Sequence, residues 1–359
     1  MKLGEACFLK SGKNITAKEI YVSPKDNLYP CYGGNGLRGY VDKYNYEGDY
    51  NLIGRQGALC GNINRVNGKF YATEHAVVVT PLISLDIDWL YFALVGMDLN
   101  QYHTGAAQPG LNIDILNNLE IDVPIIGEQI AQATVLNKIN GMIRNRKREL
   151  EKLDDLIKAR FVEMFGDPKI NEKCWNEGVM ADFFEVKGGK RIPKGMDYSD
   201  VVTEHPYLRA TDMKNETILD DDIHYIGDDV FQHIKRYTVQ GGDIYLTNVG
   251  VNLGMAGVIP EKYSGANLTE NAVKLVPKTD RFRGIFIANY INSPGIQEYI
   301  KERKMAVGVP KLAIFRIETM PLIIPPIEKQ DEFAAFRAQV DKSKSHKKTN
   351  YKTNNKLAS

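Results

Sequence analysis

The stretch LNKINGMIRNRKRELEKLDDLIKARFVEM, residues 136–164, lies near the middle of the 359-residue chain. It contains no proline and a single glycine, Gly141. Its seam residues alternate spacings of three and four, at Leu136, Ile139, Ile143, Arg146, Leu150, Leu153, Ile157, Arg160 and Met164. This period predicts a long helix over residues 128–165 with a heptad seam along one face.

The predicted helix is long enough to act as a spacer. It extends on the order of 55 Å at about 1.5 Å per residue. We expect it to end at Gly166-Asp167-Pro168, where a glycine stops the helix and a proline prevents its continuation. Four heptads favour a helical partner, and the alternative is an amphipathic helix packed on its own domain.

The sequences on the two sides of this helix repeat one another. The distance between matching residues grows from 177 (Lys10 to Lys187) to 201 (Gln129 to Gln330), as insertions in a second copy would require. The motifs recur in the same order: Lys10-Ser11-Gly12-Lys13 with Lys187-Gly188-Gly189-Lys190, Tyr29-Pro30 with His205-Pro206, Thr73-Glu74-His75-Ala76-Val77 with Thr269-Glu270-Asn271-Ala272-Val273, Pro109 with Pro310, and Pro124 and Gln129 with Pro325 and Gln330. The order indicates a duplicated unit, and the alternative is two unrelated domains with similar strand patterns.

Each copy is predicted to be rich in short strands. Aromatic and β-branched segments bounded by glycine, asparagine or proline occur at 49–54, 75–81, 243–248 and 271–277. One amphipathic helix is expected in each copy, near 88–103 and near 284–303. The predicted fold class is therefore α+β, with two tandem β-rich domains that are each followed by a helical spacer.

The domain boundaries follow from these patterns. We expect domains at 1–124 and 169–326, with the long spacer at 125–168 between them. A second spacer begins at residue 327, but its apolar spacing stops after Val340. We therefore expect a truncated helix over 327–342 and a disordered basic tail over 343–359.

Composition sets wider limits. Hydrophobic content of 43%, charged content of 25% and a net charge of +1 are those of an ordinary globular protein. With no run of about 18 apolar residues and no signal-peptide core, we expect a cytoplasmic protein without a membrane partner. Cys7, Cys31, Cys60 and Cys174 form no CxxC pair, which indicates reduced thiols rather than a disulfide framework or a zinc site.

No catalytic motif is found in the sequence. Residues 34–39, GNGLRG, match GxGxxG, but a strand-like segment follows where a dinucleotide site needs a helix. A tight turn explains these glycines better. Walker A, HExxH, GxSxG, EF-hand and amino-methyltransferase motifs are absent. We expect no catalysis, no metal and no cofactor in this chain.

Two β-rich repeats, each followed by a Pro-x-x-x-x-Gln helix start, with a heptad helix between them, resemble the specificity subunit of type I restriction–modification systems. The resemblance covers residues 1 to about 341. It implies two target-recognition domains, each reading half of a bipartite double-stranded DNA site, and spacer helices that dock adenine methyltransferase subunits. Restriction translocase subunits would complete the assembly. S-adenosylmethionine and ATP would be used by those partners, not by this chain.

DNA contacts are expected from polar side chains in the glycine-rich loops. Lysine and arginine would hold phosphates, and Arg55 with Gln56 would pair with guanine or adenine edges. For each residue alone, a solvated loop side chain is the alternative. The candidates are Lys13, Asn35, Arg38, Arg55 and Gln56 in the first copy and Lys190, Arg191, Arg209, Thr211, Asn248 and Asn252 in the second.

Partner contacts are expected along the heptad seam, at Leu136, Ile139, Ile143, Leu150, Leu153 and Ile157. A truncated second helix would leave the part of the seam around Leu150, Leu153 and Ile157 uncovered. A methyltransferase helix, a second copy of this chain or a separately encoded fragment would then cover it. Two other classes remain open: a DNA-modifying enzyme, which would need a catalytic motif, and a repeat-built module that binds protein or RNA.

Overall fold

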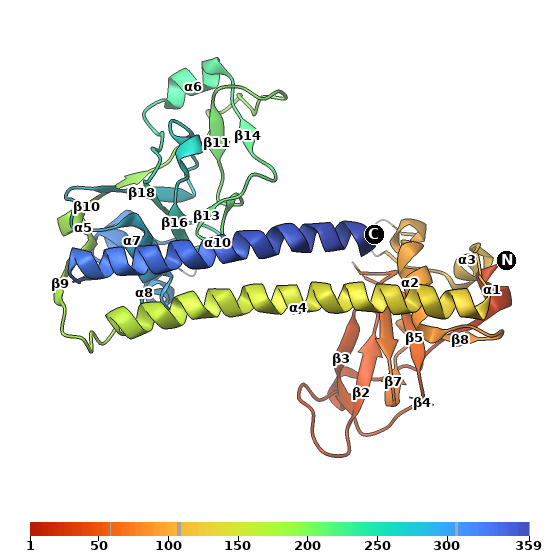
Figure 1. Cartoon of the computed structure of the whole chain (residues 1–359). Coiled ribbons are helices and arrows are strands. Elements are labelled where there is room, and N and C mark those ends of the chain that lie inside the picture. Colours follow the sequence, from red (N-terminus) through yellow and green to blue (C-terminus); the bar gives the residue numbers. More distant parts are fainter. Residues whose placement is uncertain (58, 106–108, 306–307, 359) are drawn as a thin grey trace. The chain divides into compact units, whose positions relative to one another are not determined.

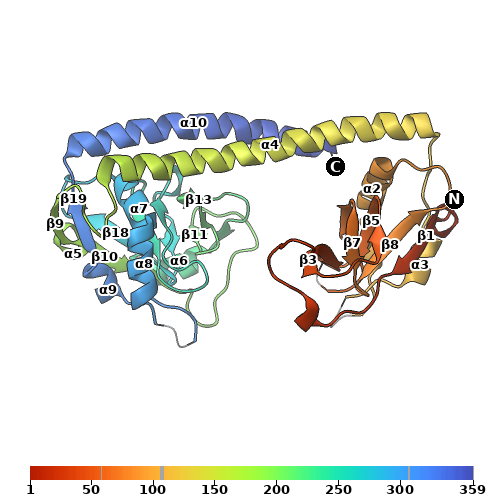
Figure 2. The ribbon, with the colours of Figure 1, turned by 90° about the horizontal axis from the view of Figure 1, so that it is seen from below.

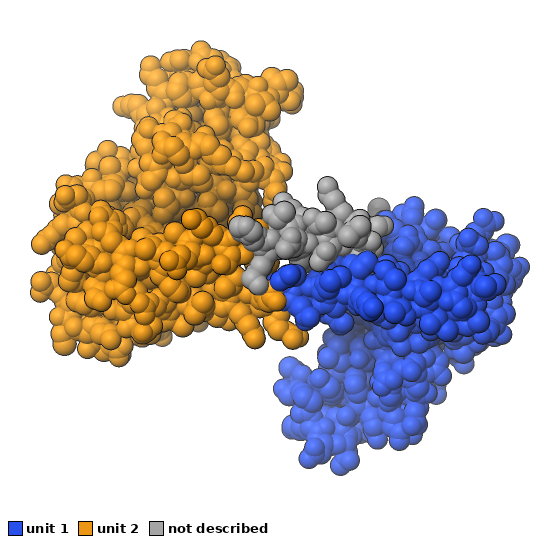
Figure 3. Space-filling view, in the orientation of Figure 1, with its two compact units in different colours: residues 1–147, 349–359 blue, residues 148–348 orange. Residues whose placement is uncertain are grey.

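The computed structural model describes residues 1–57, 59–105, 109–305 and 308–358, with side chains as far as residue 345. It forms two compact units, one of residues 1–147 with 349–359 and one of residues 148–348 (Figure 3). Two β-rich regions are separated by the long helix α4 (Ile126–Phe165), which confirms the predicted α+β fold class (Figure 1).

The first β-rich region has two sheets, with strand orders β1-β8-β5-β6 and β3-β2-β7-β4. Its elements are α1 (Leu3–Ala6), β1 (Cys7–Ser11), η1 (Ala17–Glu19), β2 (Tyr29–Gly33), β3 (Gly36–Val41), β4 (Tyr46–Glu47), β5 (Tyr50–Gly54), β6 (Ile63–Val66), β7 (Lys69–Ala72), β8 (Ala76–Pro81), α2 (Ile87–Gly96), η2 (Leu99–Tyr102) and α3 (Ile113–Asn118).

The second region has a main sheet of order β10-β18-β15-β16, a sheet of order β14-β11-β17 and two strand pairs, β12-β13 and β19-β9. Its elements are β9 (Asn176–Val179), α5 (Met180–Phe183), β10 (Phe184–Gly188), β11 (Pro206–Leu208), β12 (Met213–Lys214), β13 (Thr217–Ile218), β14 (His224–Tyr225), α6 (Asp228–Ile234), β15 (Ile244–Thr247), β16 (Ala256–Val258), η3 (Glu261–Tyr263), β17 (Asn267–Leu268), β18 (Ala272–Pro277), α7 (Gly284–Asn292), α8 (Pro294–Arg303), α9 (Ile314–Glu318) and β19 (Pro321–Ile324), followed by α10 (Ile327–Ala358).

The repeat in the sequence is also a repeat in the fold. The main sheets have the same strand order, and each copy has one parallel pair in the other sheet, β2 with β7 and β11 with β17. The backbone N–H of Gly57 donates to the Pro109 carbonyl at 3.0 Å, and that of Gly250 donates to Pro310 at 2.9 Å. Residues aligned by the motif ladder therefore occupy equivalent positions in the two copies.

The amphipathic helix expected in each copy is divided into two shorter helices. In the first copy Asp98 has a φ of 43°, a left-handed conformation that separates α2 from η2. In the second copy Pro294 starts the new helix α8 directly after α7. Proline favours the first helical turn because it has no backbone N–H to leave unpaired there.

The Pro-x-x-x-x-Gln motif fastens each long helix to its own domain. The buried Gln129 amide donates to the Pro124 carbonyl, and its oxygen accepts from the backbone N–H of Asp86 before α2, both at 2.8 Å. Gln330 repeats this arrangement with the Pro325 carbonyl at 3.0 Å and the backbone N–H of Arg283 at 2.9 Å. One buried side chain thus joins the start of each long helix to the start of an earlier helix of its domain, α2 or α7.

Replacing Gln330 with alanine should lower the free energy of unfolding of the second unit by about 1–3 kcal/mol, because buried backbone groups lose their partners. The matched control is Gln339→Ala on the exposed face of the same helix, which should change stability by less than about 0.5 kcal/mol. Urea unfolding measures both. If both substitutions change the free energy of unfolding equally, the buried Gln330 amide does not hold α10 to its domain.

The second long helix continues beyond residue 342. α10 continues to Ala358, so the predicted helix end at residue 342 and the disordered tail from 343 are wrong for residues 343–358. After Pro326 the chain contains neither glycine nor proline, and lysine is a good helix former. Loss of the apolar period removes a packing face but does not break a helix.

Within the second unit, α10 covers the end of the heptad seam, where it lies alongside the C-terminal part of α4 (Figures 1 and 2). Ile157 is buried and Leu153 is partly buried in a core that includes Phe333, Phe336 and Val340 of α10. Salt bridges join the same helices, from Arg160 to Glu332 at 2.7 Å and from Lys344 to Asp154 at 2.5 Å. Ile157 is thus covered within this chain and not by another chain, and a partner contact of the partly buried Leu153 stays a prediction.

The other candidates for partner contacts are half-buried along α4: Leu136, Ile139, Ile143 and Leu150. Their role as partner contacts stays a prediction.

Candidate nucleic-acid interface

A hollow of about 460 Å³ opens in the first copy beside the β2–β3 hairpin. It is lined by residues 33–38 of the hairpin, by Gln56 and Gly57 after β5, and by His75 before β8. We call it the first-copy hollow. The hairpin packs directly on the loop after β5, because a Cβ on Gly34 would lie 2.7 Å from the Gln56 carbonyl oxygen. The GxGxxG sequence is thus a hairpin turn, as predicted.

A second hollow, of about 410 Å³, opens in the second copy. It is lined by residues 209–211 after β11 and 269–271 before β18, together with Arg191, Tyr198 and Tyr207 among others. We call it the second-copy hollow. Burial raises the pKa of the Tyr207 phenol to about 12, so it stays neutral and donates to the Lys190 carbonyl at 2.9 Å.

The two hollows occupy equivalent places in the duplicated fold. Tyr32 pairs with Ala72 and Leu208 pairs with Leu268 in the parallel strand pairs, so residues 33–35 correspond to 209–211. His75 and Asn271 are likewise equivalent, since each accepts a backbone hydrogen bond from the residue after the matching strand, Arg55 or Asn248. Their side chains differ, so the same place presents different chemistry in each copy.

Three of the five candidates in the first copy line its hollow: Asn35, Arg38 and Gln56. Arg55 does not, because its guanidinium donates to the Leu111 carbonyl and to the Ser11 hydroxyl, both at 3.3 Å. Lys13 is exposed beyond the end of β1 and lies outside the lining. The structure thus separates Arg55 from Gln56, which the sequence placed together as base readers.

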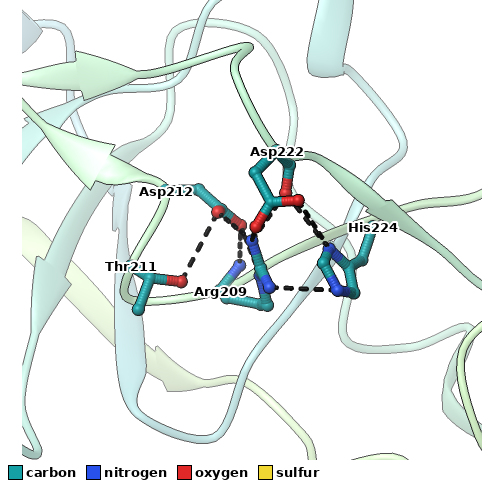
Figure 4. A network of polar contacts seen from close by, with 5 residues as sticks. All are labelled: Arg209, Thr211, Asp212, Asp222 and His224. Carbon is teal, nitrogen blue, oxygen red and sulfur yellow. Dashed lines mark hydrogen bonds and ion pairs between the residues drawn. The ribbon is translucent and has the colours of Figure 1, made fainter. Parts of the chain in front are cut away.

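Arg191, Arg209 and Thr211 line the second-copy hollow. Arg209 is held by a polar network (Figure 4). It donates to Asp212 at 2.7 Å and to Asp222 at 2.8 Å, and lies 3.1 Å from the His224 ring. The hydrogen bond from Arg209 holds the pKa of Asp222 below its usual range. A guanidinium with these partners is a structural group more than a free base reader.

The other three candidates in the second copy, Lys190, Asn248 and Asn252, lie outside that lining. Asn248 is buried, and its amide donates to the Leu312 carbonyl at 3.4 Å. The Asn252 carbonyl accepts a hydrogen bond from the Thr247 hydroxyl. Asn248 therefore cannot reach a base edge without leaving the core.

Replacing Arg209 with methionine should lower the free energy of unfolding of the second unit by about 1.5–3 kcal/mol, because the buried Asp212 carboxylate loses its charged donor. The control Thr211→Val removes only a contact of 3.5 Å to the same carboxylate and should change stability by less than about 0.5 kcal/mol. Denaturant unfolding of both variants is the measurement. An Arg209 variant as stable as the wild type would return Arg209 to the candidates for direct DNA contact.

Sequence reasoning missed the residues beside β8 and β18 as candidates. Glu74 lies 3.1 Å from His75, which lines the first-copy hollow, and Glu270 of the second-copy hollow pairs with Arg191 at 2.6 Å. Both glutamates belong to the repeated Thr-Glu-x-Ala-Val motif. The sequence did contain a signal, because a glutamate occurs at the same place in both copies, Glu74 and Glu270. We used these glutamates only to align the two copies.

The comparisons with known proteins decide the family. Residues 1–154 and 172–355 match the family described as the type I restriction modification DNA specificity domain. The chain belongs to this family. A specificity subunit recognises the DNA target within its complex and is not itself catalytic, as predicted from the absence of catalytic motifs.

Relatives and solved structures agree with this family. The specificity subunit of the EcoprrI type I restriction enzyme of Escherichia coli is 48% identical over 141 residues, which are 39% of this chain and 35% of that protein. A putative type I specificity subunit of Mycoplasma pneumoniae is 22% identical over 93% of this chain and 86% of its own length. The first match thus spans about a third of its relative.

The fold of this specificity subunit resembles that of the crystallised type I S subunit from M. genitalium, with a TM-score of 0.62 and 17% identity over all of this chain and 93% of that one. No helix of the described chain is both long and apolar enough to cross a membrane. Among the described residues, no group of three or more histidines, cysteines, aspartates or glutamates is placed to hold a metal ion.

Proposed function

We propose that this specificity subunit reads a bipartite double-stranded DNA site, one half with the first-copy hollow and the other half with the second-copy hollow. The observation that carries the proposal is the equivalent position of two hollows with different linings. Base edges in the major groove present distinct patterns of donors and acceptors, so two linings of different chemistry suit two different half-sites. Residues 1–124 and 169–326 would be the two reading domains.

The linings suggest how each half is read. Asn35 and Gln56 carry amides of the kind that pair with adenine, and Arg38 carries the donors that suit guanine or a phosphate. In the second copy, the Arg191 guanidinium carries the donors that suit guanine, and the Thr211 hydroxyl can bond to any base. Glu270 would accept from the amino group of cytosine. Lys13 and Lys190, outside the linings, would contact phosphates.

The family supports a proposal for the partners. Adenine methyltransferase subunits would dock on the seam of α4 around Leu136, Ile139, Ile143 and Leu150, and restriction translocase subunits would join them. A second specificity chain or fragment is the alternative occupant of that seam. The catalytic partners would use S-adenosylmethionine and ATP. A structure from work on complex assembly of a type I system shares the fold with a TM-score of 0.55.

Methyl transfer to duplex DNA tests the proposal. The cognate methyltransferase with S-adenosylmethionine should methylate adenine in a two-part site only when this chain is added, and the chain alone should transfer no methyl group. Methylation of the same site without this chain would contradict the proposal, as would methyl transfer by the purified chain.

A further inference from the structure

A third hollow, of about 220 Å³, lies in the second copy and has several cationic side chains in its lining. It is lined by residues 187–188 of β10, residues 236–238 before β15, Leu268 and Lys274. We call it the basic hollow. Three cationic side chains, those of Lys187, Arg236 and Lys274, belong to this lining, together with the Thr238 hydroxyl.

Two of these cations are neighbours on adjacent strands of the main sheet. Lys187 and Lys274 are direct partners in the antiparallel pairing of β10 with β18, so their side chains leave the same face. Like charges directly opposite one another are destabilising. In the first copy, Lys10 at the equivalent place is paired with the uncharged Val78. The second copy therefore has one lysine more than the first at this place in the sheet.

Both lysines of the basic hollow have an acidic partner outside its lining, whereas Arg236 has none among the described residues. Asp243 pairs with the half-buried Lys274 at 3.2 Å, and Glu185 pairs with Lys187 at 2.8 Å, but neither carboxylate belongs to the lining. Arg236 is exposed and has no hydrogen bond or ion pair with any described residue. A guanidinium with five donors thus belongs to the lining and has no partner among the described residues.

The basic hollow also adjoins the second-copy hollow. Leu268 lines the first of these and the next residue, Thr269, lines the other. Lys190 connects them, because its carbonyl accepts from Tyr207 in the second-copy hollow and its ammonium lies 5.9 Å from the Tyr237 ring of the basic hollow. The two hollows are therefore neighbours in the second domain.

We propose that the basic hollow binds a phosphate group of the DNA backbone, held by Arg236, Lys187 and Lys274 with the Thr238 hydroxyl. This inference rests on the proposed function and deepens it. The contact would position the second domain on DNA without reading sequence, as phosphate contacts do. It would also make binding of the second half-site more dependent on salt than binding of the first, because the first copy has Val78 where the second copy has Lys274.

The test compares the double variant Arg236→Gln/Lys187→Gln with the control Lys278→Gln/Lys301→Gln, which removes two exposed lysines of the same domain outside all three hollows. DNA affinity of the full chain with its methyltransferase is measured from 50 to 200 mM salt. The test variant should bind about tenfold more weakly for every sequence, with the salt slope reduced by about one to two. The control should keep the wild-type slope, and the preferred sequence should be the same in all three proteins.

A second arm separates free phosphate from the DNA backbone. The thermal stability of the isolated chain is measured with inorganic phosphate, which needs no DNA and no partner. An unchanged affinity and salt slope for DNA would overturn the assignment to the backbone, even if the variant lost stabilisation by free phosphate. Loss of sequence preference at the second half-site, with the slope unchanged, would make these residues base readers and would also overturn it. Failure of the wild-type complex to prefer any sequence would instead count against the proposed function.

Discussion

The double substitution Asn35→Ala/Gln56→Ala should relax or abolish the choice of bases in one half of the methylated site and leave the other half unchanged. Both amides line the first-copy hollow and neither supports the fold through a hydrogen bond of its side chain to a described residue. A contact to a base edge contributes about 1–3 kcal/mol, so two lost contacts should reduce discrimination on the order of a hundredfold. Methylation rates on duplexes altered in one half-site at a time measure this directly.

The matched change in the second copy is Arg191→Gln/Thr211→Ala, which should affect only the other half-site. Arg191 is exposed and Thr211 makes one weak contact, so both domains should stay folded. If the first double variant weakens methylation equally for every sequence, these side chains contact phosphates and do not read bases. If it changes both half-sites, the division of labour between the copies is wrong.

The substitution Phe333→Ala should lower the free energy of unfolding of the second unit by about 3–5 kcal/mol. Phe333 of α10 is fully buried, and its ring centroid lies 5.4 Å from that of Phe161 and 5.8 Å from that of Phe165 on α4. These rings pack with Phe286 of α7, so the substitution leaves a cavity where the two long helices meet the domain. We expect the first unit to keep its stability.

The two tryptophans allow the units to be followed separately. Trp89 lies in the core of the first region, and Trp175 packs on the core that contains Phe333 and donates to the Phe165 carbonyl at 3.0 Å. In a Trp89→Phe background, fluorescence during urea unfolding therefore reports the second unit. The control Phe336→Ala removes a half-buried ring and should cost less than half as much. Equal stability of the Phe333 variant and the wild type would show that α10 does not support this core.

Most of the fold could be predicted from the sequence, because the spacing of apolar residues and the order of repeated motifs determine its main elements. The heptad spacing gave the long central helix, and the order of repeated motifs gave two copies with equivalent strands. The length of α10 could not be predicted in the same way. The apolar period ends at Val340, but Lys344 continues the contact with α4 through a salt bridge, which no apolar pattern records.

The candidate site was harder to predict, because side-chain partners come from distant parts of the chain. Arg209 donates a hydrogen bond to Asp222, which is 13 residues away in the sequence. The buried Asn248 donates one to the carbonyl of Leu312, which is 64 residues away. Both had the residue type and loop position of DNA contacts. Asn35, Arg38 and Gln56 line one hollow because the β2–β3 hairpin packs on the loop after β5, a tertiary contact that the glycines permit but do not specify.

The most direct test of the central claim is a map of methylated adenines in the genome of cells that carry the cognate methyltransferase with this chain, with its Asn35→Ala/Gln56→Ala variant, or without it. We predict one two-part motif with a fixed gap in the first case, a motif relaxed in a single half in the second, and no motif in the third. The same two-part motif in cells without this chain would contradict the account.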